Sequence, residues 1–378
     1  MGRAFQYYLP VNLIFGTGKT EVLGAETKKY GSRALIVTGQ GSTKKTGLLA
    51  RAEGLLREEG MEVCIFDKAT PNPLADTVYE GVARAKEFGA EVVVALGGGS
   101  IIDCAKAIAF SYYNEGDIFD YIYGIKQGTE ALPLVAVPTT CGTGSEGNCF
   151  AVLTNTATKD KKSLRNIVSV PKVSILDPEL MTTMPDSVAS SVMFDALCHN
   201  MEAYISRTIQ PLVEMQALYG MKLLAGNMRK ALADHSNLDA WSAVTLASTL
   251  GGMCINMAGV TAPHGMEHPA SGLKNIVHGR GLAALSPVIY RESVVYAPEK
   301  FGEISRILGG TSAADFIDQL MLLLEEIGLK TTLSNEGIEE KDIDWMVDNC
   351  LKVSVPAMHV HPKVFEKEEI RDLYYKAL

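Results

Sequence analysis

The sequence lacks any long run of lysine or arginine, and its overall charge is negative. Its 378 residues carry 35 lysines and arginines against 44 aspartates and glutamates, a formal net charge of −9. Nucleic acids and anionic membranes both select for clustered positive charge, so we expect neither as a partner. A basic-then-apolar signal peptide is also missing. The uncharged stretch Trp241 to Pro263 has the Ser, Thr, Asn and Gly content of a buried helix rather than of a membrane span.

Cysteine is scarce, and its seven copies do not form a pattern. They are scattered along the chain without a C-x-x-C pair, at positions 64, 104, 141, 149, 198, 254 and 350. An odd, unpatterned set predicts reduced thiols in a cytoplasmic protein rather than a disulfide framework. Cys198 adjoins His199, but successive helical residues point about 100° apart, so we expect it in the core.

Short β-branched runs alternate with amphipathic stretches in the first half of the chain. The runs 33–38, 62–66, 91–96 and 132–137 predict buried strands, and 44–59 and 75–88 have helical spacing. This alternation predicts an α/β domain with a parallel sheet covered by helices on both faces. Ligands of such sheets bind at the carboxyl ends of the strands.

Strand signals stop after residues 174–177, and helical periodicity follows. We expect a long helix from 186 to 204, capped by Asp186, and further helices at 211–233, 238–257, 312–327, 338–351 and 367–377. The prediction is therefore an α/β domain over residues 1–186 and an all-α domain over residues 187–378.

Histidine is also scarce, yet three of the seven copies fall within fifteen residues. His264, His268 and His278 lie downstream of Asp195 and His199, which are spaced i, i+4 and so share one face of a helix. One carboxylate with neutral imidazoles suits Fe(II) or Zn(II) and fits poorly with Ca or Mg. The alternative is that these histidines cap helices or bond within a core, as single histidines often do. For the whole set, a metal site is the prediction.

Two polar loops are predicted to follow neighbouring strands. Gly97, Gly98, Gly99 and Ser100 end one strand and open a helix, where glycine and free N–H groups suit a phosphate. A turn would also collect glycine. The second loop, Pro138 to Glu146, brings hydroxyls to the same edge of the sheet. Together they predict a nucleotide site.

The first strand is followed by neither a G-x-G-x-x-G motif nor an acidic residue. Gly39 stands where an acid would bind the ribose and repel a 2′-phosphate, and Ser42, Lys44 and Lys45 follow it. This pattern favours NADP(H) over NAD(H). The alternative is that the two lysines begin a solvated helix.

Several motifs, taken in order, resemble the iron-containing (group III) alcohol dehydrogenase family, in particular its butanol-dehydrogenase-like branch. They are GGGSIIDCAK at 97–106, PTTCGTGSEGN at 138–148, LDPELMTTMP at 176–185, FDALCHNMEAY at 194–204 and HGMEHPASGLKNIVHGRG at 264–281. The resemblance covers essentially the whole chain. It implies a dinucleotide-binding domain followed by a helical metal domain, in a dehydroquinate synthase-like architecture, acting on small alcohols and aldehydes as a homodimer.

The resemblance also implies roles for individual residues. Asp195, His199, His264 and His278 match the family's ligands for iron, or sometimes zinc, and His268 matches a histidine near the nicotinamide that helps to relay a proton. The matched cofactor-binding positions are Gly97, Gly98, Gly99, Ser100 and Asp103 in the first loop and its helix, Thr139, Thr140 and Thr143 in the second loop, and Asn148 and Lys161 near the nicotinamide. Pro269 directly follows His268, and because proline disfavours the interior of a helix, a regular helix through His264 and His268 is not assured.

Two other functions stay open at this point. One is a metal-dependent lyase that resembles dehydroquinate synthase, which would need a basic pocket; Lys274 and Arg280 are the main cations near the histidines. The other is a nucleotide-binding sensor without catalysis, which would not need a complete metal set. A metal-dependent dehydrogenase that exchanges hydride between a nicotinamide and a carbonyl carbon is the prediction.

Overall fold

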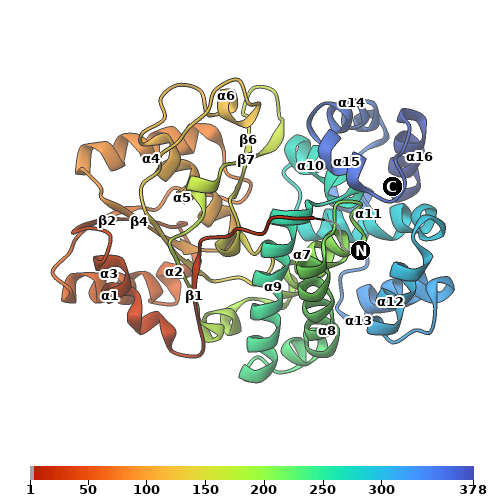
Figure 1. The fold of residues 1–378 in the computed structure, drawn as a ribbon, viewed down its shortest axis with the longest axis horizontal. Coiled ribbons are helices and arrows are strands. Elements are labelled where there is room, and N and C mark those ends of the chain that lie inside the picture. The colour runs from red at the N-terminus through yellow and green to blue at the C-terminus, as the bar shows by residue number, and fades with distance from the viewer. Residues whose placement is uncertain (1–3) are drawn as a thin grey trace. The chain divides into compact units, whose positions relative to one another are not determined.

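A computed structural model describes residues 4–378 (Figure 1). The chain forms two compact units. The first, here called the sheet unit, contains residues 8–158 and 162–183. The second, the helical unit, contains residues 4–7, 159–161 and 184–378. The predicted domain boundary near residue 186 stays a prediction.

The sheet unit is built on six parallel strands in the order β1-β8-β5-β4-β2-β3. These strands are β1 (Asn12–Phe15), β2 (Arg33–Val37), β3 (Glu62–Phe66), β4 (Val92–Gly97), β5 (Leu134–Pro138) and β8 (Val173–Leu176). Strands β4 and β5 are buried throughout, which is why they appear as continuous apolar runs. A separate pair, β6 (Phe150–Thr154) and β7 (Lys161–Arg165), forms a two-stranded sheet.

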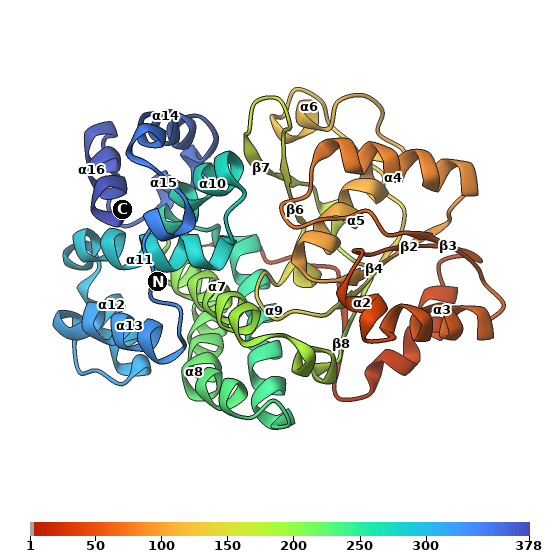
Figure 2. The same ribbon diagram turned by 180° about the vertical axis from the view of Figure 1, so that it is seen from behind.

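Helices cover both faces of the parallel sheet (Figures 1 and 2). One face packs on α4 (Ala75–Phe88) and α5 (Gly99–Ser111), and the other on α1 (Leu23–Lys28) and α3 (Leu48–Glu58). A short α6 (Ile118–Ile122) also packs on the first face. The helix expected over 44–59 is interrupted, because Gly47 takes a left-handed conformation (φ 78°) between α2 (Ser42–Lys45) and α3.

The order of the strands reverses at β2. From β2 the chain moves outward to β3 and then returns to β4 on the other side of β2. The loops that leave β2 and β4 therefore turn away from each other at the carboxyl edge of the sheet. Ligands of open α/β sheets bind at this position.

The helical unit contains ten α-helices in the described chain. They are α7 (Asp186–Ile205), α8 (Pro211–Ala233), α9 (Leu238–Ala258), α10 (Ala262–Lys274), α11 (His278–Ser293), α12 (Pro298–Leu308), α13 (Phe316–Glu326), α14 (Ile343–Val353), α15 (Val355–Val360) and α16 (Lys367–Ala377). The fold class, an α/β domain with a parallel sheet followed by a helical domain, is confirmed.

Two local expectations meet different outcomes. Asp186 was expected to cap α7, and this is wrong: Pro185 holds the cap position, and the Asp186 carboxylate instead lies 2.7 Å from Nε2 of His235. Helix α9 is long and apolar enough to cross a membrane, as is the bent pair of α12 and α13 taken together. However, α9 packs against α7 and α8 and fully buries Trp241, so it serves as a core helix.

Candidate metal and nucleotide sites

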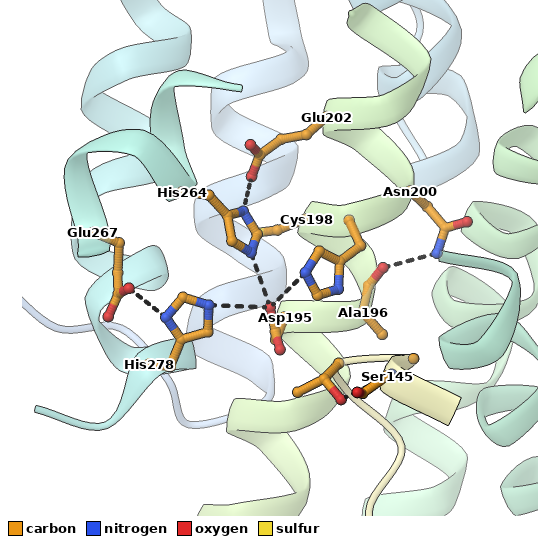
Figure 3. Close-up of polar contacts among 12 residues, drawn as sticks. Ser145, Asp195, Ala196, Cys198, Asn200, Glu202, His264, Glu267 and His278 are labelled. Carbon is orange, nitrogen blue, oxygen red and sulfur yellow. Dashed lines mark hydrogen bonds and ion pairs between the residues drawn. The ribbon is translucent and has the colours of Figure 1, made fainter. Parts of the chain in front are cut away.

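Four predicted metal ligands meet within the helical unit (Figure 3). Helix α7 places Asp195 and His199 one turn apart, α10 brings His264, and His278 is the first residue of α11. The Nε2 atoms of His264, His199 and His278 lie 3.3, 3.5 and 3.7 Å from the same oxygen, Oδ1 of Asp195. Three imidazoles from three helices thus converge on one carboxylate oxygen.

The side chains at this point fit a divalent metal. Oδ1 of Asp195 and Nε2 of His264 are buried, and neither has a hydrogen-bond partner among the described residues. Such atoms are costly to bury unless a partner is supplied. One carboxylate oxygen and three imidazole nitrogens are a ligand set for iron or zinc. Asp195, His199 and His264 are almost fully buried, and His278 is 23% exposed, so solvent reaches the site beside His278.

Two further carboxylates orient the imidazoles from behind. Nδ1 of His264 lies 2.6 Å from Oε1 of Glu202, whose other oxygen accepts hydrogen bonds from the backbone N–H (2.6 Å) and hydroxyl (3.1 Å) of Thr261. Nδ1 of His278 forms an ion pair with Oε2 of Glu267, although the contact lacks the geometry of a hydrogen bond. A carboxylate on Nδ1 fixes the tautomer and directs the lone pair of Nε2 toward a metal.

Burial and charge together set the protonation of the site. Burial raises the pKa of Asp195, but the three surrounding imidazoles outweigh it and hold the pKa well below its usual range. Burial likewise raises the pKa of Glu267, yet His278 and Lys161 bring it down to about 2. Burial lowers the pKa of His199 to about 4. Burial would lower the pKa of His264 as well, but Glu202 and Asp195 outweigh it and raise this pKa to about 10. Ionised carboxylates and neutral imidazoles are the forms that bind metals, so metal binding must displace a proton from His264.

His268 lies one turn after His264 on α10. Its ring centroid is 5.7 Å from that of His278 and 6.1 Å from that of His264. Pro269 does not interrupt the spacing, because α10 continues through it to Lys274. His268, Glu267 and His278 also form a compact group of possible ligands. The proton-relay role of His268 stays a prediction.

The two predicted phosphate-binding loops lie against each other in the sheet unit. A Cβ atom on Gly98 would stand 2.9 Å from Oγ1 of Thr140, and one on Gly99 would collide with Thr143. Gly97 has a φ of 157° and ends β4, and Gly99 begins the 13-residue α5. Gly98 and Gly99 are therefore required by the close approach of the second loop. The N–H groups of Gly99 and Ser100 at the start of α5 are placed to face an anion, whereas those of the next two residues donate to the carbonyl of Gly98. Thr139 donates its backbone N–H to Gly97.

Buried polar side chains fix the second loop. The carboxylate of Asp103 accepts hydrogen bonds from the hydroxyl of Ser145 (2.5 Å) and the backbone N–H of Val152 (3.0 Å). Lys106 is fully buried and donates to Ser145, to the side-chain oxygen of Asn148 and to the carbonyl of Phe150. In this structure Asp103 and Asn148 therefore position the loop; their predicted contact with a cofactor stays a prediction.

Lys161 lies in the helical unit, where its ammonium is 3.8 Å from Oε2 of Glu267. At the end of β2, a Cβ on Gly39 would have ordinary space, 3.4 Å from the nearest atom. Ser42 begins α2, and Lys44 forms an ion pair with Asp67 just after β3.

The sequence interpretation missed three residues that shape these sites. Glu202 follows Asp195 by seven positions, which returns it to the same face of α7, and Glu267 directly precedes His268. Both lie inside the quoted motifs, but helical spacing alone does not distinguish them from other acidic residues. Lys106 closes the GGGSIIDCAK motif, and nothing in its neighbours marks a lysine as buried.

Comparison with known proteins places the chain in a family. A model described as iron-containing alcohol dehydrogenase matches residues 10–178, and its C-terminal counterpart matches residues 188–378. The chain is 37% identical over 361 residues to a 1,3-propanediol dehydrogenase of Klebsiella pneumoniae, covering 93% of each chain. It is 30% identical over 380 residues to an NAD-dependent methanol dehydrogenase of Bacillus methanolicus, covering 98% of this chain and 99% of the relative.

The structure is similar to that of an archaeal halo-thermophilic alcohol dehydrogenase from a Red Sea brine pool, with a TM-score of 0.96, 32% identity and full coverage of both chains. The protein belongs to the iron-containing alcohol dehydrogenase family. It is an oxidoreductase that acts on alcohols, and the family implies iron and a nicotinamide cofactor. The membership confirms the predicted class of enzyme and does not support the lyase and sensor alternatives.

Proposed function

We propose that the protein interconverts a small primary alcohol and its aldehyde at a metal held by Asp195, His199, His264 and His278. The observation that carries this proposal is the convergence of three Nε2 atoms on Oδ1 of Asp195 in a buried cluster. Oδ1 of Asp195 and Nε2 of His264 have no hydrogen-bond partner among the described residues. When bound, the metal supplies a Lewis acid for the substrate oxygen, and the nicotinamide exchanges the hydride.

The chain's own residues have distinct tasks in this proposal. Glu202 and Glu267 hold the rings of His264 and His278 in the tautomer that leaves Nε2 free. The ammonium of Lys161 balances the charge of Glu267. His268 exchanges a proton with solvent beside the exposed edge of His278.

We propose further that NADP(H) is favoured over NAD(H). Support comes from Gly39, which puts no carboxylate at the end of β2, and from Ser42 and Lys45 in the segment that follows. Two facts oppose a strong preference: Lys44 already pairs with Asp67, and the Bacillus methanolicus relative is named for NAD. Both cofactors therefore belong in the test.

The proposal places the enzyme in the cytoplasm as a homodimer. The scattered cysteines, which form no C-x-x-C pair, support a reducing compartment. The dimer rests on the family resemblance alone, and sedimentation of the purified protein would test it.

The test is metal-dependent turnover with a matched histidine control. Protein reconstituted without oxygen with Fe(II), and in parallel with Zn(II), is supplied with butyraldehyde and either NADPH or NADH. We expect His264→Ala to lose bound metal and turnover while still binding the reduced cofactor. His235→Ala removes a histidine that pairs with Asp186 outside the site, so it should keep both. Normal metal content and turnover in His264→Ala would show that the assigned site is wrong.

A further inference from the structure

The helical unit contains a cavity of about 440 Å³ that none of the four candidate metal ligands lines. It is open to solvent on one side and is lined by α11, α13, α16 and the segment 330–332. Its volume falls within the range of about 300–1,000 Å³ that is usual for small-molecule sites. The dehydrogenase reaction described above does not use it.

The floor of the cavity is apolar. This floor comes from three helices and consists mainly of small or aliphatic side chains: Ala284, Pro287, Val288, Met321, Leu324 and Ala377. Leu324 and Ala284 are almost fully buried, whereas Met321 and Val288 are partly exposed to the cavity side. Binding of an apolar chain to this surface would be favourable, because it removes apolar area from water.

The rim of the cavity is positively charged. Arg291, Lys330 and Lys376 line it. Lys376 pairs with the lining carboxylate of Glu292 at 2.9 Å, and Lys330 pairs with Glu325 at 3.4 Å. Arg291 has no ion-pair partner in the described part of the chain. In a protein whose net charge is −9, an arginine without an ion-pair partner beside an apolar cavity favours an anionic ligand. A guanidinium is well suited to a carboxylate because it can donate two parallel hydrogen bonds.

Hydrogen bonds hold the wall formed by the segment 330–332 in place. The hydroxyl of Thr331 donates to Glu336 at 2.8 Å, and Arg280 binds the same carboxylate through Nε. The backbone N–H of Leu333 donates to the carbonyl of Ala377 at 2.8 Å, which fastens this segment to α16. A wall that is already ordered lowers the conformational cost of binding.

We propose that this cavity is a second binding site, for a carboxylate that bears an unbranched apolar chain. The chain lies on the floor between α11 and α13, and the carboxylate pairs with Arg291 at the rim. Helix α11 also begins with His278, so the occupant rests on the helix that supplies a predicted metal ligand.

The test is calorimetric titration of the full-length protein with octanoate. We expect one saturable site, about tenfold weaker binding in Arg291→Gln from the loss of a charge-assisted hydrogen bond, and no binding in Ala284→Phe, which fills the floor. Octanamide should bind at least about tenfold more weakly than octanoate, because it lacks the charge.

Two control variants separate this cavity from other sites. Arg306→Gln removes an exposed arginine of α12 that is paired with Glu303, and it should bind octanoate normally. His264→Ala should also bind normally, since it disables only the candidate metal site. The proposal is overturned if octanoate does not saturate, if octanamide binds equally well, if Arg291→Gln has no effect, or if His264→Ala abolishes binding.

Discussion

Replacing Glu202 with glutamine should damage the metal centre through a hydrogen-bond rearrangement, without a change in size. The carboxylate has two different partners. One oxygen accepts from the backbone N–H and hydroxyl of Thr261, and the other faces Nδ1 of His264 at 2.6 Å. A backbone N–H can only donate, so in Glu202→Gln the amide oxygen must keep the Thr261 side. The NH₂ group then faces His264.

An NH₂ group donates its proton, so Nδ1 of His264 becomes the acceptor and the ring proton moves to Nε2. That proton would lie toward Oδ1 of Asp195, which is 3.3 Å away, and a protonated Nε2 cannot ligate a metal. Loss of such a supporting carboxylate typically weakens metal affinity by about 10- to 100-fold, which is roughly 1.4–2.7 kcal/mol. We expect a loss in this range.

Titration of the metal-free protein with Zn(II) against a competing chelator measures this affinity directly. Glu303→Gln, at a partly exposed glutamate of α12 that pairs with Arg306, is the matched control and should bind like the unmodified chain. Circular dichroism must show that both variants are folded. If Glu202→Gln bound zinc within twofold of the unmodified chain, the orienting role of this carboxylate would be refuted.

Two further predictions concern stability. Lys106→Met should lower the free energy of unfolding, measured by urea denaturation, by about 3–5 kcal/mol, because it leaves the oxygens of Ser145, Asn148 and Phe150 without their donor. Lys45→Met at the surface is its control, and an equal loss of stability in both variants would contradict the argument. Burial raises the pKa of Cys254 from its usual value of 9 to about 12, so the unfolded chain loses this proton first and stability falls between pH 9 and 12. In Cys254→Ala the fall should be shallower by up to about 1.4 kcal/mol per pH unit, and an unchanged slope would count against it.

Strands β2, β3, β4 and β5 and the helices α7, α8 and α9 could be predicted because the spacing of their apolar residues reflects their burial. Helix α8 matches the expected range at both ends, and α9 differs by one residue. Strand β1 and helices α12 and α15 were missed, and so were α10 and α11. The sequence of α10 and α11 is rich in glycine, proline and histidine, which have low helix propensity, and packing in the helical unit overrides that preference.

The candidate ligands could be found from the sequence because two side chains on one helix can bind the same metal only when they are about one turn apart, as Asp195 and His199 are. Their supporting groups could not be chosen in the same way. Acidic residues are common on helices, and Glu202 differs from its neighbours only because His264, 62 positions later, approaches it in the folded chain. Lys106 shows the same limit, since a lysine gives no sign of burial until its acceptors are placed.

The three-residue segment 159–161 has a consequence for the modularity of this protein. The chain passes between the two units after residues 7, 158, 161 and 183, so the helical unit is not one continuous piece of the gene. A fragment starting at residue 184 would encode all four candidate ligands but would leave Glu267 without Lys161, and Asn349 and Lys352 without Asp160. Exchange of this unit between relatives would therefore have to carry the short segment along with the helices.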